Sequence, residues 1–79
     1  MTNKHPITEC IETQLQRYLD DLKGTPPSDL YPMVLAIVEK PMLELVMQYT
    51  KQNQSLAAQY LGINRNTLHK KLVEHQLLK

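Results

Sequence analysis

The residues best suited to chemistry lie between positions 61 and 72, where the sequence reads LGINRNTLHKKL. Amide, guanidinium, hydroxyl, imidazole and ammonium groups follow one another there, on Asn64, Arg65, Thr67, His69, Lys70 and Lys71. Leu68 and Leu72 are four residues apart, so in a helix they form one apolar face and leave the polar groups on the other faces. Such donors bind anions and other hydrogen-bond acceptors. The segment therefore predicts a short basic helix that could face a polyanion.

Catalysis and metal binding have few candidate residues. They are His5, His69, His75 and Cys10, and no carboxylate is placed to orient either of the two later histidines. His69 and His75 are six residues apart, which points them to different faces of a helix. Cys10, close to Ile7, is more typical of a small buried or edge residue than of a reactive thiol. The sequence predicts no catalytic residue, no metal site and no cofactor.

Charge is unevenly divided along the 79 residues, although the net charge is only +1. Residues 1–50 carry four basic and seven acidic side chains, a charge of −3, whereas residues 51–79 carry five basic side chains and one acidic, a charge of +4. The basic end could bind a polyanion, or it could be an ordinary solvated face; charge alone leaves both interpretations open.

The location of the protein is predicted from what the sequence lacks. No run of about 18 apolar residues could span a membrane, and the first ten residues have no apolar core of a signal peptide. The single cysteine cannot form an internal disulfide, which agrees with a reducing compartment. We expect a cytoplasmic protein.

Two helices are predicted before the basic segment. Apolar residues from Ile7 to Leu22 recur at steps of three and four, and Thr8 is the expected N-cap of a helix that ends by about residue 23. A second helix, over residues 29–51, should begin at Ser28 or Asp29. Pro41 interrupts it, so we expect a kink near residue 40, with two separate helices as the alternative.

The second helix is apolar on almost all sides, which requires more cover than one chain of this size provides. The simplest cover is a second copy. We therefore expect residues 1–51 to form dimerisation helices within a single domain of residues 1–79. The contact residues expected in the dimer are Ile11, Leu15, Tyr18, Leu22, Met33, Val34, Ile37, Val38 and Leu45.

Residues 52–79 predict a helix-turn-helix. Asn53 can cap a helix over residues 54–61, Gly62 fits the left-handed position that ends it, and Asn64 can cap a last helix from Arg65 to about His75. In a helix-turn-helix that binds DNA, the start of the second helix enters the major groove. Arg65 could then donate two hydrogen bonds to guanine, while Asn64 is either a base-reading residue, a plain cap or both.

The segment NQSLAAQYLGINRNTLHKKL, residues 53–72, resembles the C-terminal helix-turn-helix of the Fis family of bacterial nucleoid proteins. The upstream DLYPMVLAIVEKPMLELVMQYT, residues 29–50, resembles the long central helix of that family, including its internal proline. The resemblance implies an all-α fold of four helices per chain, in an intertwined homodimer with a four-helix core. It also implies a nucleoid-associated transcriptional regulator that bends DNA, because the two recognition helices are too close together for straight DNA.

The resemblance also assigns roles residue by residue. Asn64 and Arg65 match the base-reading pair of the family. His69 stands where a Fis protein commonly has arginine, and Val73 and Glu74 stand where lysines would extend the phosphate contacts, so we expect weaker and less salt-sensitive binding. The positions that match contacts to the DNA backbone are Lys51, Asn53, Ser55, Thr67, Lys70 and Lys71.

The partners implied are double-stranded DNA, a second copy of the chain and, as a further candidate, RNA polymerase. About six residues precede the first predicted helix, so the mobile arms through which some Fis proteins stimulate DNA invertases are not expected. Two alternatives stay open: a dimeric helical module that binds protein, and the helix-turn-helix region of an enhancer-binding activator.

Overall fold

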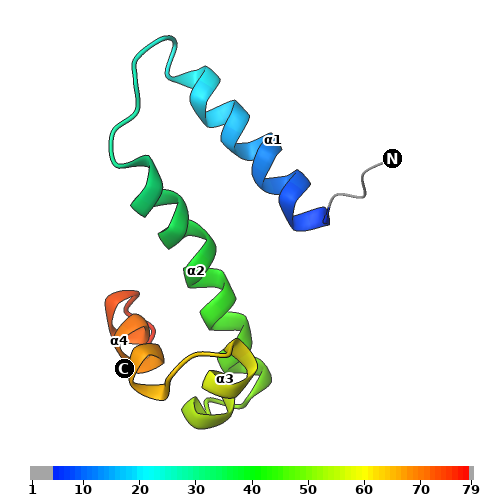
Figure 1. Ribbon diagram of the computed structural model, residues 1–79, viewed down its shortest axis with the longest axis vertical. Coiled ribbons are helices and arrows are strands. Elements are labelled where there is room, and N and C mark those ends of the chain that lie inside the picture. Colours follow the sequence, from blue (N-terminus) through cyan, green and yellow to red (C-terminus); the bar gives the residue numbers. More distant parts are fainter. Residues whose placement is uncertain (1–4, 79) are drawn as a thin grey trace. The chain divides into compact units, whose positions relative to one another are not determined.

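The computed structural model describes residues 5–78, and this part of the chain contains four helices and no strand (Figure 1). They are α1 (Pro6–Asp21), α2 (Leu30–Tyr49), α3 (Gln54–Leu61) and α4 (Arg65–Glu74). The predicted all-α class is confirmed. The chain divides into two compact units after Leu30, so that α1 belongs to the first unit, and most of α2, with α3 and α4, belongs to the second.

Helix α1 starts earlier than predicted. His5 is its N-cap, with ring Nδ1 accepting a hydrogen bond from the backbone N–H of Ile7 at 3.1 Å. Pro6 occupies the first helical position, where a missing N–H costs nothing and the fixed φ suits the helix. The expected cap at Thr8 is therefore wrong, because the imidazole at position 5 already supplies the acceptor. The predicted end is confirmed, since the helix stops at Asp21 before Gly24, which has a φ of +86°.

Helix α2 is one continuous helix of 20 residues, so the alternative of two separate helices is wrong. Pro41 lies inside it, and the backbone stays helical on both sides of the proline. At about 1.5 Å per residue the helix is about 30 Å long. It begins one residue after Asp29, whose φ of +54° lies in the left-handed region rather than in the extended region that N-cap residues usually adopt.

The core of the second unit joins the C-terminal half of α2 to α3 and α4. Half-buried side chains surround it, among them Val46, Ile63 and Leu77. The small residues of α3, Ala57 and Ala58, are buried and let the neighbouring helices come close. The six buried hydrophobic side chains are Leu43, Met47, Ala57, Ala58, Leu68 and Leu72.

The connection from α2 to α3 contains two consecutive non-glycine residues in the left-handed region. Lys51 has a φ of +53° and Gln52 a φ of +66°. The N–H of Gln52 donates to the carbonyl of Met47 at 2.8 Å, and the buried hydroxyl of Thr50 donates to the carbonyl of Val46 at 2.9 Å. The carbonyls at the end of α2 are therefore satisfied by a turn that strains its own backbone.

Replacing Gln52 with glycine should stabilise the protein by up to about 1 kcal/mol. The left-handed conformation costs a residue with a Cβ about 1–2 kcal/mol, and the greater freedom of glycine in the unfolded chain offsets part of the gain. Urea unfolding at fixed protein concentration measures the difference. The control is Gln59→Gly in the middle of α3, which should lose about 1 kcal/mol. A Gln52→Gly protein less stable than wild type would show that Gln52 makes a contact worth more than the strain.

Candidate nucleic-acid interface

The two ends of α3 have the capping residues predicted from the sequence. The side chain of Asn53 accepts a hydrogen bond from the N–H of Leu56 at 3.0 Å. Gly62 ends the helix with a φ of +72°, and its N–H donates to the carbonyl of Ala58 at 2.9 Å. Only glycine adopts this conformation at low cost. The chain therefore turns sharply after α3.

Helix α4 begins directly after this turn. The side chain of Asn64 accepts a hydrogen bond from the N–H of Asn66 at 2.7 Å, which confirms Asn64 as the cap. Leu68 and Leu72 are completely buried, so the predicted inward face of α4 is also confirmed. The other side chains of the helix are exposed except that of Lys71, and a recognition helix requires such an exposed face.

The predicted DNA-binding residues are exposed in the single chain, with one exception. The exposed ones are Lys51, Asn53, Ser55, Asn64, Arg65, Thr67, His69 and Lys70. Lys71 is the exception, because it is half-buried and its side chain is engaged elsewhere. Asn53 and Ser55 lie at the start of α3, and Asn64, Arg65 and Thr67 lie at the start of α4, where free backbone N–H groups also favour an anion.

Gln54 joins the two helices of the motif, and the sequence analysis did not single it out. Its side-chain oxygen lies 3.2 Å from Nδ1 of His69. Because an amide oxygen can only accept, Nδ1 of His69 is the donor and Nε2 is left for other partners. The contact holds His69 of α4 against the first turn of α3, next to the predicted phosphate contact at Ser55.

Glu39 of α2 binds two side chains of α4, which the sequence analysis also missed. Its Oε2 lies 2.9 Å from Nζ of Lys71, and its Oε1 lies 2.8 Å from Nε2 of His75. Glu39 is one of only four clearly polar residues of α2, and Lys71 and His75 are four residues apart. The scarcity of polar residues in α2 and the four-residue spacing of Lys71 and His75 were the available signals in the sequence. Neither signal identifies a partner 32 or 36 residues away in the chain.

The contacts shift two pKa values in opposite directions. Hydrogen bonds from His75 and then from Lys71 lower the pKa of Glu39 below its ordinary value of 4.5. The hydrogen bond to Glu39 and its negative charge raise the pKa of Lys71 above its ordinary value of 10.5. Both shifts favour the charged forms, so they describe a stabilising ion pair in the neutral range.

These directions predict how the pair contributes to stability at different pH values. Because the pKa of Glu39 is lowered, its contribution to stability is present above about pH 4.5 and is lost as pH falls through the pKa of the folded state. Because the pKa of Lys71 is raised, its contribution is present below about pH 10.5 and is lost as pH rises through the pKa of the folded state. The difference in unfolding free energy between wild type and Glu39→Gln should therefore be largest in the neutral range. Urea unfolding at a series of pH values checks this, with Glu44→Gln of the same helix as control. A difference that grows in acid would contradict it.

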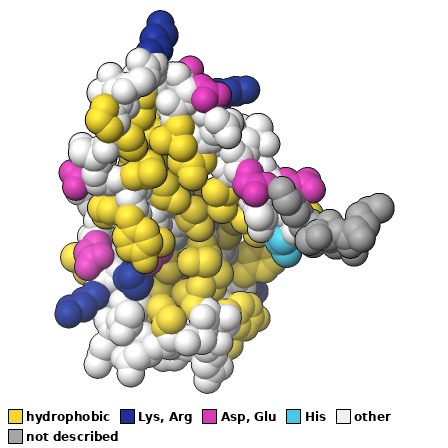
Figure 2. All heavy atoms as spheres, turned by 45° about the horizontal axis from the view of Figure 1, so that its top comes forward, with side chains coloured by type: hydrophobic (Ala, Val, Ile, Leu, Met, Phe, Trp, Pro, Cys, Tyr) yellow, Lys and Arg dark blue, Asp and Glu magenta, His cyan; other side chains and the backbone are white. Residues whose placement is uncertain are grey.

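The residues expected in a dimer contact are not part of the core of the single chain. Ile37 and Leu45 are 62% and 54% exposed, and Tyr18 and Val38 are each 37% exposed. The remaining five are half-buried, namely Ile11, Leu15, Leu22, Met33 and Val34. Figure 2 shows hydrophobic side chains at the surface over much of the face it draws.

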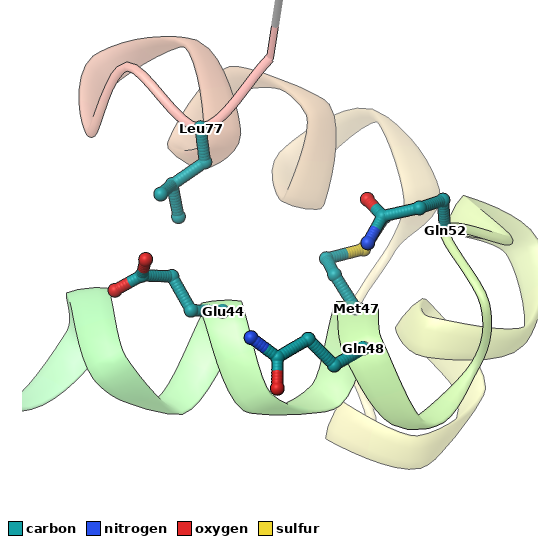
Figure 3. A pocket seen from close by; sticks show the side chains of 5 residues that line it. All are labelled: Glu44, Met47, Gln48, Gln52 and Leu77. Atoms are coloured by element: carbon teal, nitrogen blue, oxygen red, sulfur yellow. The ribbon is translucent and has the colours of Figure 1, made fainter.

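A small pocket of about 140 Å³ lies beside α2 (Figure 3). It is lined by Glu44, Met47, Gln48 and Gln52, and by Leu77 from the segment after α4.

Within residues 5–78, no three His, Cys, Asp or Glu side chains gather where they could hold a metal ion. In the same part of the chain, no helix has the length and apolar character needed to cross a membrane.

The sequence model of the bacterial regulatory protein Fis family matches residues 34–75, which include the C-terminal part of α2 and all of α3 and α4. That match spans more than half of the chain. The chain belongs to the Fis family. Fis-family proteins are DNA-binding regulators and not enzymes, so the enzyme class is set aside.

Individual relatives support the same assignment over almost the whole chain. A Fis-like DNA-binding protein of Ralstonia nicotianae is 55% identical over 76 residues, which are 96% of this chain and 99% of the relative. The DNA-binding protein Fis of Histophilus somni is 51% identical over 75 residues, which are 95% of this chain and 76% of the relative. A Fis-like DNA-binding protein of Neisseria meningitidis is 53% identical over 72 residues, or 91% of each chain.

Proposed function

We propose that this Fis-family protein is a homodimer that binds and bends double-stranded DNA as a nucleoid-associated transcriptional regulator of the bacterial cytoplasm. The observation that carries the proposal is the construction of α4. Leu68 and Leu72 fix its inward face in the core, and Asn64 and Arg65 are exposed at its start. This is the arrangement in which a helix N-terminus enters a major groove. The names of the relatives, which refer to DNA binding, support it.

We assign the recognition of bases to Arg65 and Asn64. The exposed guanidinium of Arg65 can donate two parallel hydrogen bonds to O6 and N7 of guanine. The side-chain oxygen of Asn64 already accepts from the N–H of Asn66, so its two amide N–H groups are the donors best placed to contact DNA. Asn64 therefore serves as cap and donor at once, and it favours an acceptor on the base or phosphate.

We assign contacts with the DNA backbone to the side chains around Arg65 and Asn64. Asn53 has the same double role as Asn64, because its oxygen is occupied by Leu56. Lys71 has three N–H donors, of which one is directed at Glu39, so we give it a smaller share of phosphate binding. The set proposed for the backbone is Lys51, Asn53, Ser55, Thr67, His69, Lys70 and Lys71.

A second copy of the chain is the proposed cover for the exposed apolar side chains of α1 and α2. The nine residues named for the dimer contact are not buried in the single chain, and the long apolar helix α2 requires cover. Residues 1–51 then provide dimerisation and residues 52–79 provide the helix-turn-helix. Sedimentation equilibrium at micromolar concentration should give the mass of two chains, and a folded monomer would refute the dimer.

Gel-shift titration tests the proposal as a whole. The duplexes carry guanines at both ends of a degenerate core, with spacings from about 10 to 21 base pairs, one to two helical turns. Salt steps measure the number of phosphates contacted, and circularly permuted fragments detect bending. Binding with position-dependent mobility is expected. No binding at low salt would favour the alternative, a helical module that binds protein, and RNA polymerase would then be the first partner to test.

A further inference from the structure

The contact of Glu39 with Lys71 and His75 connects α2 to the far end of the proposed recognition helix. Lys71 lies in the last turn of α4 and His75 is its C-cap, and each donates to a different oxygen of the same carboxylate, at 2.9 and 2.8 Å. The side chains of Glu39 and His75 are only 24% and 12% exposed. A partly buried carboxylate with both oxygens occupied is a fixed contact rather than a passing surface pair.

The apolar contacts alone do not fix how α4 is turned on α2. Leu68 and Leu72 bury the inward face of α4 in a core shared with Leu43 and Met47. Hydrophobic contact is itself non-directional, so these side chains restrain rotation and tilt of α4 only through the shape of their packing. Hydrogen bonds are directional, and Lys71 and His75 both donate to one carboxylate. The two bonds therefore restrict the rotation and the tilt of α4.

We propose that Glu39 is a positioning residue for DNA recognition, which acts through Lys71 and His75 to fix the orientation of α4. This rests on the proposed function. Arg65 lies six residues before Lys71, about 9 Å along the helix at about 1.5 Å per residue. A tilt of about 10° about the buried Leu68, which is three residues from Arg65, would displace Arg65 by about 0.8 Å, whereas a designed polar site must be held to about 0.5 Å.

The proposal predicts a change in affinity for the preferred DNA that is opposite in sign to the change that simple electrostatics predicts. Glu39→Gln removes a negative charge and releases the ammonium of Lys71, and both effects should strengthen binding to a polyanion. If Glu39 positions α4, the same substitution weakens binding to the preferred sequence, because Arg65 loses its fixed geometry. Non-specific binding, which needs only charge, should stay equal or become tighter.

The experiment compares wild type, Glu39→Gln and Glu44→Gln. Glu44 lies on the same helix, is exposed and carries the same charge, so its variant is the control for the loss of one acidic group. Each protein is titrated against the duplex that wild type enriches from a degenerate pool and against mixed-sequence DNA at the same salt. Urea unfolding sets a temperature at which all three are folded.

Glu39→Gln should bind the enriched duplex about 5- to 10-fold more weakly than Glu44→Gln does, with no loss on mixed-sequence DNA. His75→Ala should show the same loss of specificity without removing an acidic charge. The inference is overturned if Glu39→Gln binds the enriched duplex as tightly as the control, or if it loses affinity equally on both DNAs. If wild type enriches no duplex at all, the proposed function itself fails, and the inference fails with it.

Discussion

Arg65→Ala should lower affinity for the preferred duplex by about 1–3 kcal/mol, the discrimination that a bidentate contact to guanine provides. The guanidinium is exposed at the start of α4, and no other arginine lies in the helix-turn-helix. Without it, Asn64 is the one proposed base-reading residue that remains, because the other proposed contacts are to phosphates, which fix position but carry no sequence information. The variant should therefore bind weakly and lose most of its preference between sequences.

The measurement is a gel-shift titration of the preferred duplex and of the same duplex with its outer guanines replaced. Arg17→Ala on α1 removes the same charge outside the helix-turn-helix and should leave the ratio of the two affinities unchanged. If Arg65→Ala keeps the ratio of the wild type, Arg65 does not read the guanine and another side chain must do so.

Leu68→Ala should destabilise the second unit by about 2–5 kcal/mol, the range for removing a fully buried leucine. Leu68 is completely buried where α4 meets α3 and the end of α2. A core of six buried hydrophobic side chains has little stability in reserve, so a loss of this size could unfold α3 and α4 altogether. DNA binding would disappear for that reason alone.

Urea unfolding followed by circular dichroism measures the change, at one protein concentration because dimerisation would contribute. Val73→Ala is the control on the same helix, since Val73 is 55% exposed and should change stability by less than about 0.5 kcal/mol. A Leu68→Ala protein within 1 kcal/mol of wild type would mean that the core closes around the missing atoms at little cost.

The helix-turn-helix could be predicted from sequence to within a residue or two because its signals are local. Asn53 and Asn64 cap helices through their own side chains, and Gly62 is placed by the left-handed φ that it adopts. Each of these effects acts within about four residues. Leu68 and Leu72 identify the inward face by their spacing alone. The start of α1 was mispredicted because the imidazole of His5 accepts from the N–H of Ile7 and caps the helix three residues before Thr8.

Only the tertiary structure decided what the outward residues of the helices contact. The family resemblance placed Lys71 among the phosphate contacts, and only the structure shows that it also binds Glu39, 32 residues earlier, because packing of α4 on α2 brings the two together. Gln54 and His69 meet for the same reason. Side-chain partners across helices depend on how each helix is turned and where it lies, and these follow from the whole core rather than from any local pattern. The sequence alone determined the four helices, the caps of α3 and α4 and the family; packing determined which side chains of α2, α3 and α4 contact one another.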